Sequence, residues 1–151
     1  MNPQLEGTSP CRILIVDDLP VWADSISAFA GLFGCEARTA TTLQTAVREL
    51  IRWQPQLIIL DLHMPRDEWE PVHAIGQKYA PNQKTLAFCE QVTSHPKLGH
   101  VIVAMVSVEN QVEQQALALR AGADFFYTKG DFNVDKFEFL LNQIRAKSAV
   151  D

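Results

Sequence analysis

Carboxylate side chains stand at the ends of two short apolar runs in this 151-residue sequence. Asp17 and Asp18 follow the run 12–16, and Asp61 ends the run 57–61. Three carboxylates at close quarters repel and raise one another's pKa unless a cation joins them. Hard oxygen ligands in a partly open site suit Mg²⁺, which also accepts phosphate oxygens. An aspartate can itself be a nucleophile that forms an acyl phosphate, and Asp61 is the candidate because it stands alone on its run.

A hydroxyl group and an ammonium group follow two further expected strands, one apolar and one aromatic. Ser107 comes directly after 101–106, and Lys129 comes directly after 124–128. Around a phosphoryl group, a lysine supplies positive charge and a hydroxyl supplies a hydrogen bond. The residue types therefore favour phosphoryl chemistry, provided that the fold brings these ends together.

Apolar runs and helical periodicity alternate along the chain. The runs 12–16, 57–61 and 101–106 are apolar on both faces, which is typical of strands inside a covered parallel sheet. The segments 35–40 and 124–128 are weaker strands. Helices are expected over 22–33, 43–53, 85–92, 109–121 and 132–147, with Thr41 and Thr42 capping the second of them.

Five successive strand-helix units predict an α/β, doubly wound parallel sheet with right-handed crossovers. Parallel strands present their carboxyl ends at one edge of the sheet. In the strand order 2-1-3-4-5 the switch point lies between the first and third strands, which end in Asp17, Asp18 and Asp61. The three acids should therefore meet in one crevice.

The segment 66–84 is the least regular part of the sequence. Pro71, Gly76 and Pro81 interrupt any long helix, so only a short helix from about 71 to 79 is expected. Long connections in compact domains are usually functional or mobile. Trp69 and Tyr79 fit either local packing or a partner-binding patch.

Composition limits the class of protein. The chain has 13 basic and 18 acidic residues, a net charge of −5 that argues against a nucleic-acid partner. No apolar run approaches the ~20 residues that span a bilayer, and residues 1–10 have no apolar signal-peptide core. Three widely spaced cysteines suit a reducing compartment. We expect a cytoplasmic single domain without a membrane partner, preceded by a flexible extension over 1–10.

The ordered set of strand ends resembles the receiver domain of two-component response regulators, of the stand-alone, CheY-like kind. The resemblance covers about residues 12–147 and implies a flavodoxin-like (βα)5 three-layer sandwich. It rests on Val16-Asp17-Asp18, Asp61-Leu62-His63-Met64-Pro65, Ser107 and Lys129.

The resemblance implies a phosphorelay role. Asp61 would accept a phosphoryl group, in a Mg²⁺-dependent reaction, from a phosphohistidine on a sensor histidine kinase or a histidine phosphotransfer protein. The phosphorylated protein would then change its protein-protein interactions in signal transduction. Such a protein catalyses only its own phosphorylation and dephosphorylation, and is not an enzyme for an external substrate.

The same resemblance implies roles for the metal and the phosphoryl group. Asp18 and Asp61 would bind Mg²⁺ directly, Asp17 would bind it through water, and the backbone carbonyl of His63 would be a further ligand. Ser107 and Lys129 would hold the phosphoryl oxygens.

Other positions would control the switch. Ser107 and Phe126 stand where the family carries its switch residues, the second an aromatic ring that rotates inward on activation. His63, Glu109 and Val108 stand where side chains tune access to Asp61 and the lifetime of its acyl phosphate.

The chain departs from the family pattern at four places. Val108 follows Ser107 where a smaller residue is usual, which would narrow access to Asp61. Gly130 follows Lys129 where proline in a cis peptide is usual, so a trans peptide is expected. Trp69 replaces a usual glycine, and about 68–84 is an insertion. Gly130, Val108 and the long insertion favour an alternative function, a receiver-fold interaction module that binds partners independently of phosphorylation. A Mg²⁺ phosphohydrolase or nuclease that uses the same acids is a third hypothesis.

The expected domain organisation is a receiver domain over 11–148 with no output domain, so that the effector is a separate protein. By resemblance, the face built by the helix 109–121, the strand 124–128 and the last helix is a surface for a partner or a homodimer. Trp22 and Trp69 are expected near the acids.

Overall fold

Five parallel strands form one sheet in the order β2-β1-β3-β4-β5, as predicted for a doubly wound α/β fold. The computed structural model describes residues 10–109 and 111–150, so most of the expected flexible extension over 1–10 lies outside the described residues. The strands are β1 (Arg12–Val16), β2 (Glu36–Ala40), β3 (Leu57–Asp61), β4 (Ile102–Ser107) and β5 (Phe125–Thr128).

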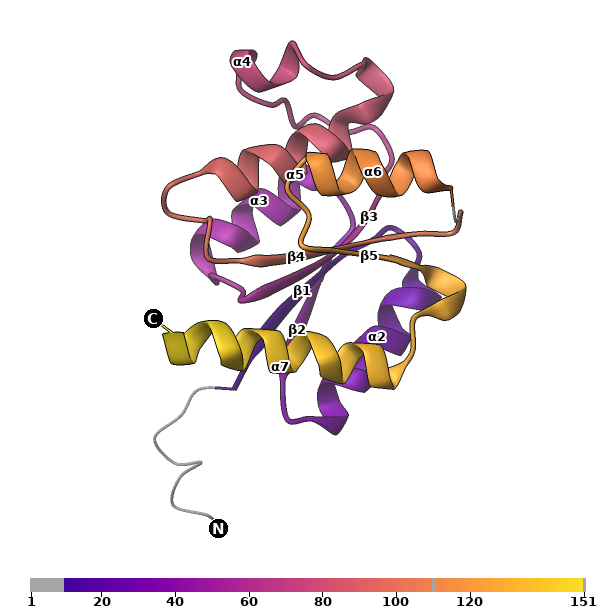
Figure 1. Cartoon of the computed structure of the whole chain (residues 1–151), viewed down its shortest axis with the longest axis vertical. Coiled ribbons are helices and arrows are strands. Elements are labelled where there is room, and N and C mark those ends of the chain that lie inside the picture. Colours follow the sequence, from indigo (N-terminus) through magenta and orange to yellow (C-terminus); the bar gives the residue numbers. More distant parts are fainter. Residues whose placement is uncertain (1–9, 110, 151) are drawn as a thin grey trace.

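Helices cover both faces of the sheet, which gives three layers (Figure 1). α3 (Leu43–Arg52), α5 (Lys84–Ser94) and α6 (Val112–Arg120) lie on one face, and α2 (Pro20–Leu32) and α7 (Val134–Val150) lie on the other. The described part of the chain contains no helix that is both long and apolar enough to cross a membrane.

The central strands alternate between two hydrophobic cores. In β3, Ile58 and Leu60 face α3 and α5, whereas Leu57 and Ile59 face α2 and α7. All five residues of β3 are buried. A strand covered by helices on both faces needs apolar residues at every position, which explains its unbroken apolar run.

Local side chains define where several helices begin. The Thr42 hydroxyl accepts a hydrogen bond from the Thr45 amide at 3.0 Å, so the predicted cap of α3 is confirmed. Pro20 opens α2, because proline suits the first helical turn. The last helix begins at Val134 instead of 132, because Asn133 Oδ1 accepts a hydrogen bond from the Lys136 amide at 3.0 Å.

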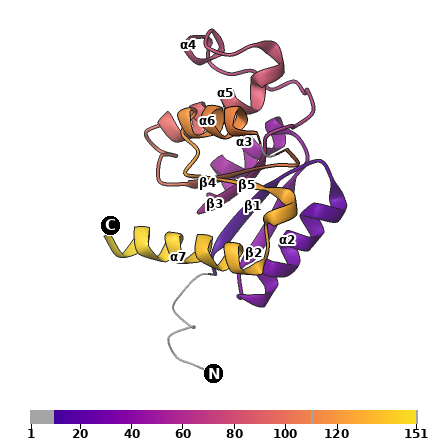
Figure 2. The same ribbon diagram turned by 45° about the vertical axis from the view of Figure 1, so that its right-hand side comes forward.

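The insertion (residues 68–84) extends beyond α5, at the top of the view in Figure 2. Its helical content is smaller than expected: α4 spans only His73–Gly76, and the 3₁₀ turn η1 spans Pro81–Gln83. The flanking prolines restrict longer helices because proline lacks the amide proton.

Polar contacts fix the insertion to the domain. The Lys84 ammonium donates to the Trp69 carbonyl at 2.8 Å and to Glu70 Oε1 at 2.7 Å. Asp67 caps α3 from outside the helix, because its Oδ2 atom accepts from the Leu43 amide at 2.6 Å. The structure shows local packing for both aromatic side chains: Trp69 is 8% exposed and packs against Phe88, and the Tyr79 hydroxyl donates to Glu90.

Candidate functional site

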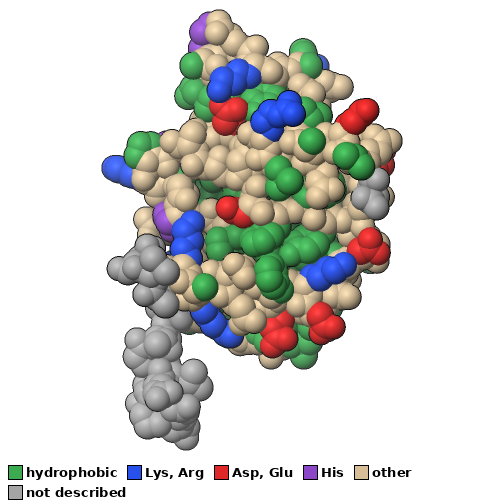
Figure 3. Space-filling model, viewed as in Figure 1, with side chains coloured by type: hydrophobic (Ala, Val, Ile, Leu, Met, Phe, Trp, Pro, Cys, Tyr) green, Lys and Arg blue, Asp and Glu red, His purple; other side chains and the backbone are tan. Residues whose placement is uncertain are grey.

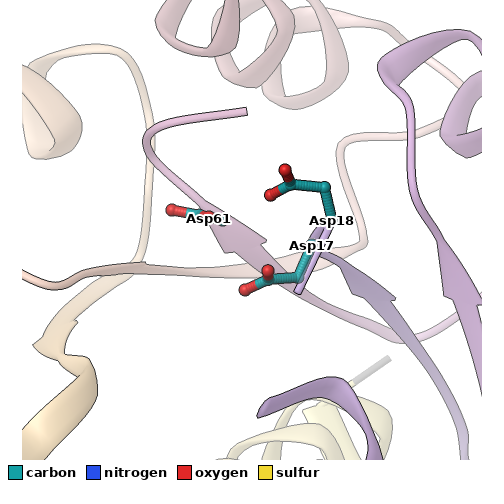
Figure 4. A group of neighbouring side chains, drawn as sticks. All are labelled: Asp17, Asp18 and Asp61. Atoms are coloured by element: carbon teal, nitrogen blue, oxygen red, sulfur yellow. The ribbon is translucent and has the colours of Figure 1, made fainter. Parts of the chain in front are cut away.

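The three acids meet at the carboxyl edge of the sheet, between β1 and β3. Asp17 and Asp18 follow β1 and Asp61 ends β3, and one carboxylate oxygen from each lies within 4.8 Å of those of the other two. Figure 4 shows the three carboxylates around a common space. Asp17 and Asp61 are buried, whereas Asp18 is exposed. The site is therefore accessible from one side.

Asp17 is the most buried of the three acids. Its Oδ1 atom accepts a hydrogen bond from the Leu19 amide at 2.8 Å. Its Oδ2 atom lies 2.7 Å from Lys129 Nζ but off the direction of a well-formed hydrogen bond, so this contact is an ion pair. Burial raises the pKa of Asp17, and the contacts with Lys129 and Leu19 offset part of that effect. The buried Oδ2 atom of Asp17 can therefore still accept a hydrogen bond or bind a cation.

Asp61 lies at the centre of the site. Its Oδ1 atom accepts from the His63 amide at 3.0 Å, and its Oδ2 atom lies 3.4 Å from Lys129 Nζ. The carboxylate is therefore oriented by the backbone on one side and by a cation on the other. This arrangement leaves the Oδ2 atom of Asp61 held by a long contact, 3.4 Å from the Lys129 ammonium.

Lys129 reaches the acids although a trans peptide joins it to Gly130, since the described residues contain no cis bond. Its side chain is 7% exposed, and its ammonium lies 4.8 Å from the centre of the Trp22 ring. The Trp22 ring packs against Phe132, with centroids 6.1 Å apart. An ammonium held over an indole face gains cation–π stabilisation. The Trp22 ring and the Asp17 carboxylate together hold the Lys129 side chain toward the acids.

Ser107 is fully buried, and its hydroxyl has partners in the segment that follows β4. Its Oγ atom accepts from the Glu109 amide at 3.1 Å and lies 3.4 Å from Gln114 Oε1. The Gln114 amide in turn donates to Glu109 Oε2 at 2.9 Å. In this structure Ser107 thus caps the start of the following connection.

The remaining predicted residues surround the site. Phe126 is half-buried and packs against the core shared by α3, α5 and α6. His63 and Glu109 are exposed, and the Val108 side chain is 68% exposed. Their roles in switching and access remain predictions.

Two contributors were not predicted as such from the sequence. Gln114 engages Ser107 from α6, and Trp22 lies under Lys129 from α2. Trp22 was expected near the acids, and its place in the first turn after the β1 acids is a signal for this role. Gln114 has no comparable signal, because a glutamine early in a helix is ordinary.

The acid set fits a divalent cation in its donor chemistry. Three carboxylates supply only oxygen atoms, and Asp17 offers a buried oxygen that accepts no well-formed hydrogen bond. Mg²⁺ prefers oxygen ligands and tolerates a site that leaves room for water. The exposed Asp18 leaves that room. The donors therefore suit Mg²⁺ better than softer metals.

Sequence comparison gives a distant relative. No protein-family model matches the chain. It is 25% identical over 135 residues to the DNA-binding dual master transcriptional regulator RpaA of Synechocystis sp.. This match covers 89% of the chain but only 48% of RpaA, so the chain spans about half the length of that relative.

Solved structures give a closer likeness in fold. A CheY-like receiver domain protein from Methanospirillum hungatei matches with a TM-score of 0.73 and 22% identity, over 95% of this chain and 100% of that one. A response regulator from Thermotoga maritima matches with a TM-score of 0.69 and 16% identity, over 90% and 98%.

A third match is the BeF3-activated receiver domain of RstA from Klebsiella pneumoniae, with a TM-score of 0.68 and 17% identity, over 89% and 98% of the two chains. The strand order, the placement of the helices and these structural neighbours agree. The chain has the CheY-like fold of response-regulator receiver domains.

Proposed function

We propose that this protein is a phosphoacceptor receiver in which Asp61 takes a phosphoryl group from a phosphohistidine. The observation that carries the proposal is the convergence of Asp61 with two further acids and the Lys129 ammonium at one sheet edge. A structural ion pair would need one acid, not three. The donor would be a sensor histidine kinase or a histidine phosphotransfer protein.

In the proposed reaction, an Asp61 carboxylate oxygen forms a bond to phosphorus while the bond from phosphorus to the imidazole nitrogen breaks. Such transfer depends on positioning and on charge stabilisation. The His63 amide, which donates to Oδ1, orients the carboxylate so that Oδ2 faces the incoming group. Lys129, 3.4 Å from Oδ2, supplies positive charge to the transferred oxygens.

Asp17, Asp18, Asp61 and the His63 carbonyl would hold Mg²⁺. The ion would neutralise negative charge that gathers between the acids and the phosphoryl group. Lys129 already neutralises part of the negative charge of the acids, because its ammonium lies 2.7 Å from Asp17 Oδ2. On phosphorylation, Lys129 would divide its contacts between Asp17 and the new phosphoryl oxygens.

Ser107 would act as the switch residue. Its hydroxyl lies 3.4 Å from Gln114 Oε1, a long distance for a hydrogen bond between oxygen atoms. Exchange of this weak contact for a phosphoryl oxygen would be favourable, since charged acceptors form stronger hydrogen bonds. Movement of Ser107 would vacate space beside β5, into which Phe126 would turn.

Hydrophobic side chains mark a surface through which a signal could be passed. Figure 3 shows them gathered between α6 and α7, over β5. β5 is an edge strand, and the Phe125 ring packs against Phe139, which is 45% exposed. We propose that a separate effector, or a second copy of the chain, binds this face.

A second candidate is an interaction module that binds its partner without phosphorylation. It is favoured by contacts within the domain: Lys129 pairs with Asp17, and the Ser107 hydroxyl accepts a hydrogen bond from the Glu109 amide, so the domain itself supplies partners for both side chains. The two candidates predict different responses to a phosphoryl analogue.

The test uses beryllofluoride, a phosphoryl analogue, with Trp22 fluorescence as the readout. Trp53 and Trp69 are changed to Phe so that only Trp22 reports. Because the Trp22 ring contacts Lys129, a saturable fluorescence change is expected only with both Mg²⁺ and beryllofluoride. Asp18→Asn should weaken Mg²⁺ binding by about tenfold or more, as expected when a charged ligand is lost.

The matched control is Asp24→Asn, which removes an exposed acid from α2. It should leave the signal unchanged, whereas Asp61→Asn should abolish it. A silent spectrum, together with partner binding that is indifferent to Mg²⁺ and to Asp61→Asn, would favour the second candidate.

A further inference from the structure

A partly open pocket of about 360 Å³ lies between α3, α5 and the connection from α5 to β4. Its walls come from the carboxyl-terminal parts of both helices and from residues just before β4, so it lies toward the sheet edge opposite the acids. Its size falls within the range of small-molecule sites (~300–1,000 Å³). Helices α3 and α5 lie on the same face of the sheet in Figures 1 and 2.

The interior of this pocket is apolar. Buried lining residues are Leu50, Trp69, Phe88, Val92 and Val101. The Trp69 and Phe88 rings meet edge to face with centroids 5.3 Å apart. Trp69 comes from the insertion, so the feature that departs most from the receiver pattern helps to build the pocket.

The rim of the pocket carries basic side chains. His95, Lys97 and His100 line it and are exposed, and no aspartate or glutamate is among the lining residues. His95 Nδ1 accepts from the Lys97 amide at 3.1 Å. The neutral His95 ring therefore carries its proton on Nε2, where it can donate to a ligand. The rim thus favours an acceptor with negative charge, although the whole chain carries −5.

Gln54 lines the same pocket in a backbone conformation that favours glycine. Its φ is 57°, and it follows the end of α3, with its amide 3.2 Å from the Glu49 carbonyl. Helices commonly place glycine at this position. Residues held in a sparsely populated conformation cluster at ligand sites. The Gln54 side chain brings a polar amide to the pocket, while its backbone carbonyl accepts hydrogen bonds from the Arg12 guanidinium.

We propose that this pocket binds a small organic anion with an apolar body, of the aliphatic or aromatic carboxylate class. The body would contact Trp69 and Phe88, and the carboxylate would lie at the rim near Lys97, with Gln54 as a hydrogen-bond donor. Inorganic phosphate is a poor candidate because the walls are apolar. The site is separate from the acids, so this proposal does not depend on the proposed function.

The test compares decanoate with decanol, which share the apolar chain and differ in charge. Each is titrated below its aggregation limit into the ¹⁵N-labelled protein, and amide shifts together with the Trp69 indole signal are followed by NMR. Saturable shifts are expected at the lining residues, with decanoate about fivefold tighter than decanol, as expected for one partly exposed charge contact. Equal affinities, or shifts spread outside the pocket, would overturn the proposal.

Gln54→Gly separates binding from folding. Glycine relieves the left-handed conformation, so this variant should raise Tm by about 2–4 °C. It should also bind decanoate about threefold or more weakly, through loss of the amide. A more stable protein with unchanged affinity would remove Gln54 from the site.

Lys97→Gln should remove most of the preference for decanoate over decanol. Its matched control is Arg52→Gln, because Arg52 is an exposed cation on α3 that does not line the pocket. The control should keep the preference. Equal losses in both variants would show a general effect of net charge and would contradict the proposed rim contact.

Discussion

The carboxyl edge of the sheet and the insertion use the same kinds of charged side chain in opposite ways. At the edge, Asp17, Asp61 and Lys129 are buried, and the Asp17 Oδ2 atom keeps unused capacity to accept. In the insertion, Lys84 donates to two backbone carbonyls and to Glu70. A buried polar group without a full set of hydrogen bonds lowers the stability of the fold. Such a group is expected where a ligand supplies the missing interaction. By this measure, the charged groups at the edge have the character of a binding site, and Lys84 in the insertion has that of a structural support.

The largest expected difference concerns Trp69. Trp69→Ala should lower the free energy of unfolding by about 3–5 kcal/mol, because it empties space against Phe88 in the core. Mg²⁺ binding by the acids should persist. Urea unfolding with and without Mg²⁺ measures both.

The control for Trp69 is Val72→Ala in the same insertion, where Val72 is 53% exposed. It should change stability by no more than about 0.5 kcal/mol. A comparable loss in both variants would mean that the insertion is not anchored by the buried ring.

A smaller effect is expected at Lys84. Lys84→Met should cost about 1–3 kcal/mol, because the side chain is only 14% exposed and its loss leaves the carbonyls of Asp67 and Trp69 without their donor. Lys78→Met is the matched change, since Lys78 is 61% exposed and pairs with Glu90. It should cost less than about 1 kcal/mol. A larger loss of unfolding free energy in Lys78→Met than in Lys84→Met, measured by chemical unfolding, would contradict the comparison.

The smallest expected effect depends on pH at Glu90. Hydrogen bonds from Lys78 and Tyr79 hold the pKa of Glu90 below its usual value. A lowered carboxyl pKa stabilises the fold above the pKa of the unfolded chain, and this contribution is lost as pH falls through the folded value. Glu90→Gln should therefore be less stable than the wild type near pH 7, by up to about 1 kcal/mol.

This difference should shrink by about pH 3, below the usual glutamate pKa. Urea midpoints at the two pH values provide the measurement. A difference that grows at low pH would contradict the assigned sign.

The sheet and the acids were predictable from the sequence for a physical reason. The apolar run that ends in Asp61 must be a buried strand, and parallel strands bring their carboxyl ends together. The Thr42 cap is equally local. These inferences need only neighbours in sequence or a regular topology.

Contacts between distant polar groups were not predictable in the same way. Lys84 reaches the Trp69 carbonyl across 15 positions, and Gln114 engages Ser107 across seven. No periodic pattern in the sequence predicts such pairs. The position of the Lys129 side chain also depends on the Trp22 ring, which comes from α2. The functional side chains at strand ends could therefore be predicted from the sequence, whereas contacts between segments far apart in the chain could not.

Phosphorylation of Asp61 is the central claim, and its most direct test is labelling with acetyl phosphate. The protein is incubated with Mg²⁺, its intact mass is measured, and the modified residue is located by peptide mapping after reduction of the acyl phosphate. The account predicts the addition of one phosphoryl group at Asp61, its loss in Asp61→Asn and its retention in Asp24→Asn. Labelling that survives Asp61→Asn, or that maps to another residue, would contradict the account.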